Sequence, residues 1–344
     1  MSPPRVGDST LHDERIEALV RWLSHRLGRP PHGLHPIAGD ASFRRYFRVF
    51  GEEGTWIAMD APPHREALAP FLHAAGIFAA VDIHVPRVHA ADERHGFLLL
   101  DDLGETSYLD CLTTGNADAL YGDALEVLFV LHHRIDPQGA RLPLYDEALL
   151  SRELDLFREW FLCGLLKLGI DAEEEALWER LQAILLASAL SQPRVVVHRD
   201  FHSRNLMVTE RNNPGVLDFQ DAVIGPLTYD LVSLLRDCYI AWPEERVRNW
   251  LEDYRRRLRT HDQRVPDAET FRRWFDLMGL QRHLKALGIF ARLKLRDGKP
   301  RYLADIPRTL AYVSSVSERY RELRQFHSFL ERRVVPALEE AGIA

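Results

Sequence analysis

Residues 194–219, RVVVHRDFHSRNLMVTERNNPGVLDF, decide the fold of this 344-residue chain. The β-branched run 195–197 predicts a buried strand, and two further apolar runs flank Asn-Asn-Pro-Gly, which is typical of a tight turn. The stretch therefore predicts a strand, a polar loop over 198–205 and then a hairpin. This hairpin returns Asp218 to the mouth of the loop.

Three oxygen-bearing side chains gather at this loop. Asp200 and Asn205 come from the loop itself, and Asp218 comes from the end of the returning strand. A carboxylate and an amide suit Mg²⁺, which keeps most of its shell for water and phosphate. The spacing H-x-D-x-x-x-x-N followed by Asp-Phe is typical of kinase-type phosphoryl transfer. We predict Asp200 as the catalytic base and Asn205 and Asp218 as Mg²⁺ ligands; the alternative is a polar surface loop of another α/β domain.

The sequence resembles the aminoglycoside-phosphotransferase-like small-molecule kinases in VHRDFHSRNLM and GVLDFQDAVIGPLTYDLVSLLRD. With GDASFRRYFRV, MDAPP and FLLLDDLG, it is similar to the bacterial N-acetylmuramate/N-acetylglucosamine anomeric sugar kinases of cell-wall recycling. The resemblance spans about Gly39 to Arg236. It implies ATP and Mg²⁺ as cofactors and transfer of the γ-phosphoryl group to the C1 hydroxyl of an amino sugar. It also implies a product that passes to a sugar-1-phosphate nucleotidyltransferase.

The expected fold class is α/β in the α+β sense, a bilobal protein-kinase-like fold. Residues 1–103 are expected to form a small antiparallel-sheet lobe, and residues 104–344 a larger, mainly helical lobe. Apolar residues make up 46% of the chain, enough for a core in each lobe. Apolar spacing predicts helices over 10–28, 64–75, 115–134, 145–169, 265–295 and 306–341.

Composition limits the partners. The net charge is −7 with both signs interspersed, so no nucleic-acid partner is expected, and an anionic substrate would need a local basic pocket. No apolar run is long enough for a membrane span, and the N-terminus lacks the apolar core of a signal peptide, so a cytoplasmic protein is expected. The three cysteines lie far apart and show no metal-binding spacing.

The nucleotide is expected to meet main-chain groups at two places. A turn at Gly39 precedes Ser42 and Phe43, and in a kinase first lobe such a turn lies over the phosphates; an ordinary hairpin turn is the alternative. The second place is the crossing between lobes, where main-chain groups can pair with adenine. The residues concerned there are Leu99, Asp101 and Leu103.

The sequence departs from the kinase pattern at its third strand. A phosphate-pairing Lys is expected at the end of 55–59, but Met59 stands there. Either metal ions alone neutralise the phosphates, or an arginine from the adjacent strand replaces the Lys; the candidates are Arg44, Arg45 and Arg48. Glu66 occupies roughly the place of the acidic partner of that Lys, and we interpret it as a favourable charge in the first turn of a helix.

The remaining residues are assigned to the substrate or to support of the loop. Arg236 would suit the lactyl carboxylate of N-acetylmuramate by bidentate pairing. The other substrate candidates are His202, Arg282 and His283, although a basic helix face such as 280–285 is usually solvated. His198 and Arg199 are expected to support the loop. Asp230 is either a charge at a helix terminus or, as the resemblance implies, a buried acceptor for the backbone of the loop.

Two rival functions stay open. Another small-molecule kinase, for an aminoglycoside, choline or thiamine, would need an acidic cleft or an aromatic cage for its cationic substrate. A nucleotide-binding pseudokinase is supported by the missing Lys and opposed by the intact Asp200, Asn205 and Asp218.

Overall fold

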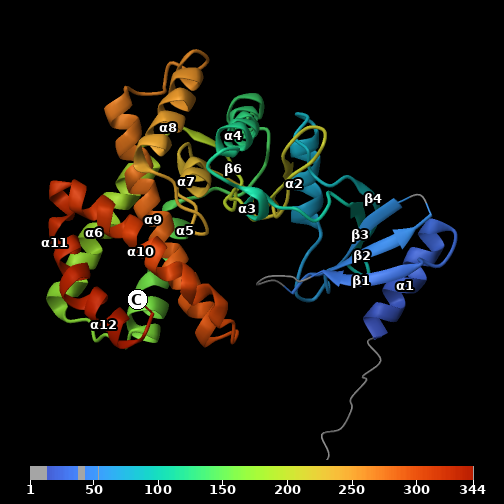
Figure 1. Cartoon of the computed structure of the whole chain (residues 1–344), viewed down its shortest axis with the longest axis horizontal. Helices are drawn as coiled ribbons and strands as arrows, with labels where there is room; N and C mark the ends of the chain where they lie inside the picture. Colours follow the sequence, from blue (N-terminus) through green and yellow to red (C-terminus); the bar gives the residue numbers. More distant parts are fainter. Residues whose placement is uncertain (1–13, 38–42, 53, 344) are drawn as a thin grey trace, which may run out of the picture. The chain divides into compact units, whose positions relative to one another are not determined.

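The computed structural model describes residues 14–37, 43–52 and 54–343, which divide into two compact units (Figure 1). The smaller unit draws on Met1–Leu72 and Pro86–Asp102, and the larger unit on His73–Val85 and Leu103–Ala344. Residues 73–85 therefore pack with the larger unit, whereas the sequence groups them with the small lobe.

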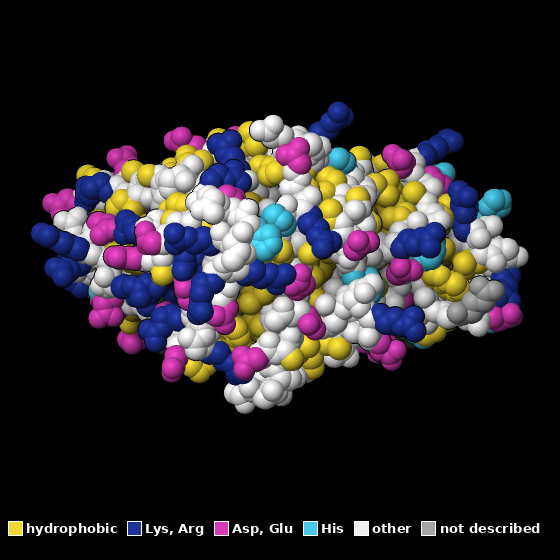
Figure 2. Space-filling view, turned by 90° about the horizontal axis from the view of Figure 1, so that it is seen from above, with side chains coloured by type: hydrophobic (Ala, Val, Ile, Leu, Met, Phe, Trp, Pro, Cys, Tyr) yellow, Lys and Arg dark blue, Asp and Glu magenta, His cyan; other side chains and the backbone are white. Residues whose placement is uncertain are grey.

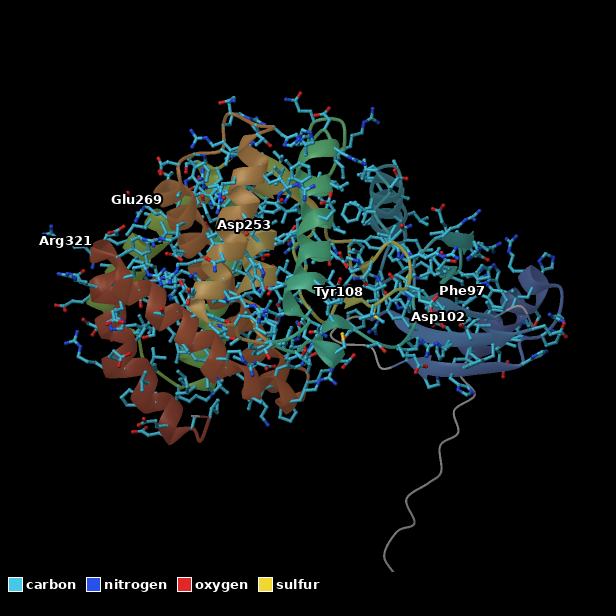
Figure 3. The ribbon with its side chains drawn as sticks, turned by 45° about the horizontal axis from the view of Figure 1, so that its top comes forward. Phe97, Asp102, Tyr108, Asp253, Glu269 and Arg321 are labelled. Atoms are coloured by element: carbon cyan, nitrogen blue, oxygen red, sulfur yellow. The ribbon has the colours of Figure 1, made fainter. Side chains whose placement is uncertain are left out.

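An antiparallel sheet in the order β1-β2-β3-β5-β4 forms the smaller unit. Its strands are β1 (Gly33–Ile37), β2 (Arg45–Gly51), β3 (Gly54–Asp60), β4 (Val88–Asp92) and β5 (Phe97–Asp101). Alternation along β2 buries Phe47 and Val49, and helix α1 (Glu14–Leu27) packs Leu19 and Leu23 against them. Phe97 of β5 completes this core (Figure 3).

Helices dominate the larger unit. Those described are α3 (Tyr108–Cys111), α4 (Ala117–Arg134), α5 (Glu147–Leu156), α6 (Ala172–Leu190), α7 (Tyr229–Leu235), α8 (Glu244–Arg259), α9 (Ala268–Leu295), α10 (Ile306–Arg319), α11 (Arg324–Phe329) and α12 (Val335–Glu340). Helix α9 contacts α5, α6, α7 and α10, and its buried side chains cover all sides, as a central helix requires. Gly288 permits its close approach to α5, because a Cβ there would lie 2.3 Å from the carbonyl carbon of Leu156.

Several boundaries differ from the sequence-based expectation. Helix α2 (Ala69–Ala79) begins five residues after the expected start at 64, because residues 63–65 form a turn. The long helices expected over 145–169 and 306–341 are interrupted by π- and 3₁₀-helical turns, at Phe157–Leu165, Arg321–Leu323 and Leu330–Val334. Helices α6 and α8 were not anticipated.

The surface and the helices agree with the composition. Acidic and basic side chains are interspersed over the face seen in Figure 2. Within the described ranges, none of the helices combines the length and the apolar character that a membrane span requires.

Candidate active site

Two short sheets of the larger unit hold the catalytic loop. Strand β6 (Arg194–Val197) pairs antiparallel with β9 (Val223–Pro226), and β7 (Leu206–Met207) pairs with β8 (Gly215–Val216). These are the strand and the hairpin that the sequence predicts. The N–H of Leu217 donates to the carbonyl of Asn205 at 2.9 Å, so the returning strand brings the next residue, Asp218, beside the loop.

Hydrogen bonds join the three predicted catalytic and metal-binding residues. The Asn205 Nδ2 donates to the carbonyl of Asp200 at 3.0 Å and lies 3.5 Å from Asp218 Oδ2. Gln220 Nε2 donates to the other oxygen, Asp218 Oδ1, at 2.7 Å. With its amide nitrogen turned to these acceptors, Asn205 keeps its amide oxygen for a hard cation.

The donor set fits Mg²⁺ rather than a metal that prefers several protein ligands. No group of three or more His, Cys, Asp or Glu in the part of the chain that the structure describes is placed to hold a metal ion. A phosphoryl-transfer site needs no such group, because Mg²⁺ retains water and phosphate ligands. Asn205 and the exposed carboxylate of Asp218 are therefore a sufficient protein contribution.

Two residues of the site have left-handed backbone conformations, Arg199 with φ 79° and Asp218 with φ 62°. Such conformations of non-glycine residues persist only where surrounding contacts enforce them. For Arg199 the enforcing contact is Asp230, whose carboxylate accepts the N–H of His198 at 2.6 Å and that of Arg199 at 3.0 Å. Asp230 thus lies where a buried acceptor for the loop is expected.

A second carboxylate, Asp237, holds the other half of the loop. It follows α7, and its Oδ2 accepts both the N–H of Ser203 at 2.9 Å and the hydroxyl of Ser203 at 2.6 Å. Its Oδ1 accepts the N–H of Tyr239 at 2.8 Å. Sequence reasoning did not assign Asp237 a role, because an Asp directly after an apolar helix gives no signal that distinguishes it from a solvated charge.

The electrostatics of the loop separate two of its carboxylates. Burial raises the pKa of Asp230 to about 7, although both N–H donors favour its anion. Burial also acts to raise the pKa of Asp200, but nearby positive charges, those of Lys285 and Arg282 among them, outweigh it and hold that pKa below its usual range. Asp200 is therefore an anion at neutral pH and can accept a proton.

His198 and Arg199 make supporting contacts. Burial lowers the pKa of His198 to about 4, so its neutral Nδ1 can accept the N–H of Asp200 at 3.3 Å. The Arg199 guanidinium pairs with buried Glu153, which also binds Lys285 Nζ at 2.9 Å. Sequence reasoning missed Glu153. Its position next to Leu154, on the apolar stripe of the helix, was the one sign that this carboxylate is buried.

Two of the predicted substrate residues are buried and engaged by other groups of the chain. Arg236 is 3% exposed, and its guanidinium pairs with Asp276 at 2.8 Å and with Glu244 at 3.1 Å, so it is already neutralised. His283 stacks on Tyr312 and donates to the carbonyl of Arg236 at 2.8 Å, while burial lowers its pKa to about 3. Both residues therefore have partners within the packing around α9, which disfavours them as substrate contacts.

The other two substrate candidates lie near the loop. His202 is buried and packs edge-to-face on Tyr239, with 5.2 Å between the ring centroids. Arg282 is also buried, and its Nη1 lies 3.6 Å from Cys238 Sγ. Both are charge neighbours of Asp200, and both stay candidates.

The residues that the sequence predicts to bind the nucleotide differ in exposure and in backbone hydrogen bonding. Ser42 lies outside the described residues, and Phe43 is exposed with the Arg65 guanidinium over its ring at 4.6 Å. Leu99 lies inside the sheet between β3 and β4, and the N–H of Asp101 donates to the carbonyl of Arg87 at 3.0 Å. Their main chains therefore take part in the sheet. Leu103 belongs to the larger unit, where it packs against Gly215.

The three candidate arginines of the smaller unit are all bound to carboxylates. Arg45 pairs with Asp60, and Arg48 makes hydrogen bonds of 2.7 and 3.1 Å to Asp102, which Figure 3 labels. Arg44 pairs with Glu66 at 2.9 Å. Interpreting Glu66 as a first-turn helix charge was wrong, because it precedes α2 and binds Arg44.

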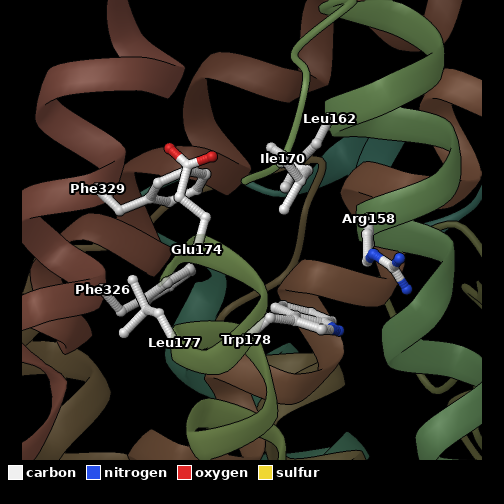
Figure 4. Close-up of a pocket in the computed structure, with 8 residues that line it drawn as sticks. All are labelled: Arg158, Leu162, Ile170, Glu174, Leu177, Trp178, Phe326 and Phe329. Atoms are coloured by element: carbon white, nitrogen blue, oxygen red, sulfur yellow. The ribbon is translucent and has the colours of Figure 1, made fainter. Parts of the chain in front are cut away.

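A separate pocket lies among α6, α11 and the π-helical turn after α5 (Figure 4). It is lined by Arg158, Leu162, Ile170, Glu174, Leu177, Trp178, Phe326 and Phe329. None of the residues that the sequence assigns to the site is among them, and the aromatic side chains belong to the core of the larger unit.

Comparisons with known proteins show a family and several relatives that this chain resembles over most of its length. Residues 33–275 match the model of the phosphotransferase enzyme family. A curated N-acetylmuramate/N-acetylglucosamine kinase of Pseudomonas putida is 46% identical over 91% of this chain and 95% of its own length. One of Neisseria meningitidis serogroup B, with the same name, is 43% identical over 96% of this chain and 99% of its own length.

Solved structures give the fold alone. The choline kinase LicA from Streptococcus pneumoniae superposes with a TM-score of 0.63 at 11% identity, over 88% of this chain and all of the other. The ADP-bound aminoglycoside phosphotransferase APH(2'')-Ib gives 0.57 at 16% identity, over 89% of this chain and 99% of the other. The predicted fold class, a protein-kinase-like fold with a small antiparallel sheet and a mainly helical remainder, is confirmed.

The contacts of Asp230 predict that Asp230→Ala destabilises the chain and slows catalysis. Two buried N–H donors lose their acceptor, which should lower the free energy of unfolding by about 2–4 kcal/mol. Urea denaturation and kcat measure the two effects. Asp253→Ala, at a carboxylate 70% exposed on α8, is the control and should change stability by less than about 0.5 kcal/mol. Wild-type stability in the Asp230 variant would contradict the proposed support.

Proposed function

This chain belongs to the phosphotransferase enzyme family, and we propose that it phosphorylates the anomeric C1 hydroxyl of N-acetylmuramate and N-acetylglucosamine, using ATP and Mg²⁺. The observation that carries the proposal is the loop of Asp200 and Asn205, with Asp218 returned beside it by the β7–β8 hairpin. The named relatives, which share 43–46% of their residues with nearly the whole chain, support the choice of sugar.

In this proposal the protein supplies position and charge. Asp200, an anion at neutral pH, orients the C1 hydroxyl and accepts its proton. Asn205 and Asp218 would hold Mg²⁺, which neutralises the charge of the phosphates when bound. An anomeric hydroxyl is more acidic than an ordinary alcohol, so a carboxylate is a sufficient base. His198 and Arg199 keep the loop in place.

The product would be a sugar 1-phosphate, which suits activation by a sugar-1-phosphate nucleotidyltransferase, and a cytoplasmic location would give access to ATP.

The charges near the loop disfavour the rival functions, in which the chain would be a kinase for a cationic substrate. Lys285 and Arg282 act on Asp200, and Arg204 lies in the loop itself. A cationic choline or aminoglycoside would meet repulsion here, whereas a neutral or anionic sugar would not.

The substrate assignment predicts ATP-dependent conversion of both amino sugars to their 1-phosphates. The 1-O-methyl glycoside of N-acetylglucosamine has no anomeric hydroxyl, and therefore no nucleophile, so it should not react. ³¹P NMR of the products, with coupling to the C1 proton, identifies the site of phosphorylation. Normal turnover of the methyl glycoside would refute the anomeric assignment and favour an aminoglycoside-type reaction.

The base assignment predicts that Asp200→Asn lowers kcat by about two to four orders of magnitude, the usual contribution of a positioned base. Affinity for Mg²⁺-ATP should change little, because Asn205 and Asp218 remain. Steady-state kinetics and nucleotide titration separate the two quantities. Glu210→Gln, at an exposed carboxylate of the β7–β8 hairpin, is the matched control. Near-normal turnover of Asp200→Asn would remove Asp200 from the role of base.

Because Arg44 pairs with Glu66, we expect Arg44 to replace the phosphate-pairing Lys that is missing at Met59. We expect Arg44→Ala to raise the KM for ATP and to lower kcat, together by about tenfold or more, the usual effect of a charged hydrogen bond. Arg44→Lys should restore part of the activity. Arg29→Ala, which removes an exposed pair with Glu52, is the control. If Arg44→Ala shows wild-type kinetics for ATP, metal ions alone neutralise the phosphates.

A further inference from the structure

Two side chains of the catalytic loop pack on a single ring, that of Tyr239. The Arg204 guanidinium lies over the ring, with 3.7 Å between its central carbon and the centroid. His202 meets the same ring edge-to-face. Asp237 binds both the N–H of Tyr239 and the N–H of Ser203, so the ring and the loop are held by one carboxylate. Arg204 is therefore held at its backbone by the loop and at its guanidinium by the ring of Tyr239.

Arg204 differs from its neighbours in having no anionic partner. Within residues 14–37, 43–52 and 54–343, its guanidinium makes no ion pair and no hydrogen bond, and the side chain is partly exposed. Arg199 and Arg236, by contrast, are neutralised by buried carboxylates. A guanidinium that stacks on an aromatic ring by its face keeps its N–H edge free for the two oxygens of a carboxylate.

The carboxylates around Arg204 are already engaged. The charge of Arg204 acts on Asp110 and Asp305, but Asp110 accepts the N–H and the hydroxyl of Ser107 at 2.9 and 2.6 Å. Asp305 accepts from the Arg308 guanidinium at 3.0 Å, and Asp237 accepts from Ser203 and Tyr239. Arg308 also donates to the carbonyl of Cys238 at 2.7 Å. The Arg282 guanidinium contacts the sulfur of the same cysteine, Cys238, and its Nε has no hydrogen-bond partner among the described residues. Because these carboxylates already accept hydrogen bonds from other groups, the N–H edge of the Arg204 guanidinium remains available to an added anion.

We propose that Arg204, oriented by stacking on Tyr239, is the residue that recognises the carboxylate of an acidic sugar substrate. The inference rests on the proposed function, and it deepens it by replacing the neutralised Arg236 as the determinant of specificity. Neutral N-acetylglucosamine would use the same catalytic loop without this contact. Since Arg204 directly precedes Asn205 in the sequence, the recognition of the carboxylate is built into the loop that carries the chemistry.

The test compares kcat/KM for N-acetylmuramate and for N-acetylglucosamine in the same variants. Arg204→Gln should lower the ratio of the two values about tenfold or more, since a charged hydrogen bond is lost for one sugar alone. Tyr239→Phe keeps the ring and should preserve the ratio, whereas Tyr239→Leu should lower it. Because each variant is judged by a ratio, a general loss of folding or metal binding cancels.

A substrate analogue makes the test independent of other effects of the substitution. N-acetylmuramate with its lactyl carboxylate converted to a carboxamide should be a poorer substrate than the acid for the wild type. Arg204→Gln should treat the acid and the amide alike. An unchanged sugar ratio in Arg204→Gln, or a change found in Arg282→Met instead, would overturn the inference while leaving the proposed function standing. Failure of the wild type to phosphorylate either sugar would refute the proposed function itself.

Discussion

Two carboxylates, one in the first turn of helix α7 and one just after its end, hold the predicted catalytic loop, and the rest of the site depends on this support. Asp230 at the start of the helix accepts the N–H groups of His198 and Arg199, and Asp237 after its end accepts those of Ser203 and Tyr239. Buried backbone donors must find acceptors, so these bonds define the path of the loop on both sides of Asp200. The left-handed conformation of Arg199 persists for the same reason.

Gathering carboxylates in the interior requires compensating positive charge. The loop supplies Arg199, and the buried face of α9 supplies Arg282 and Lys285. Glu153 links Arg199 and Lys285, so the cations are themselves held in place by an acid from α5. The two carboxylates therefore have pKa values shifted in opposite directions. The nearby positive charges lower the pKa of Asp200, whereas burial raises the pKa of Asp230. The proposed general base, Asp200, and the structural acceptor, Asp230, thus differ in pKa although both lie at the same loop.

The sequence predicts those parts of the site whose cause is local. The strand 195–197, the turn at Asn-Asn-Pro-Gly and the spacing of Asp200 and Asn205 all lie within one stretch, and the structure has the strand and the hairpin at these positions. Contacts between distant residues were not predictable in this way. Glu153 lies 46 residues from Arg199, and no periodicity or turn chemistry connects the two. The interrupted helices after α5 and α10 also reflect tertiary packing, which overrides local preference.

The partners of Arg236 and Arg204 show why a charged residue near a predicted site is weak evidence that this residue binds a ligand. Arg236 directly follows helix α7, whose Asp230 supports the loop, yet Asp276 and Glu244 neutralise it, and both are supplied by other helices. Arg204 has no sequence feature to distinguish it, yet an aromatic ring fixes its plane and no acid occupies its edge within the described residues. A guanidinium that is buried between acids of its own chain is a poor receptor for a ligand carboxylate, because a displaced buried acid would be left uncompensated. The capacity for recognition is therefore set by the partners of an arginine, and these partners become visible only once the chain is folded.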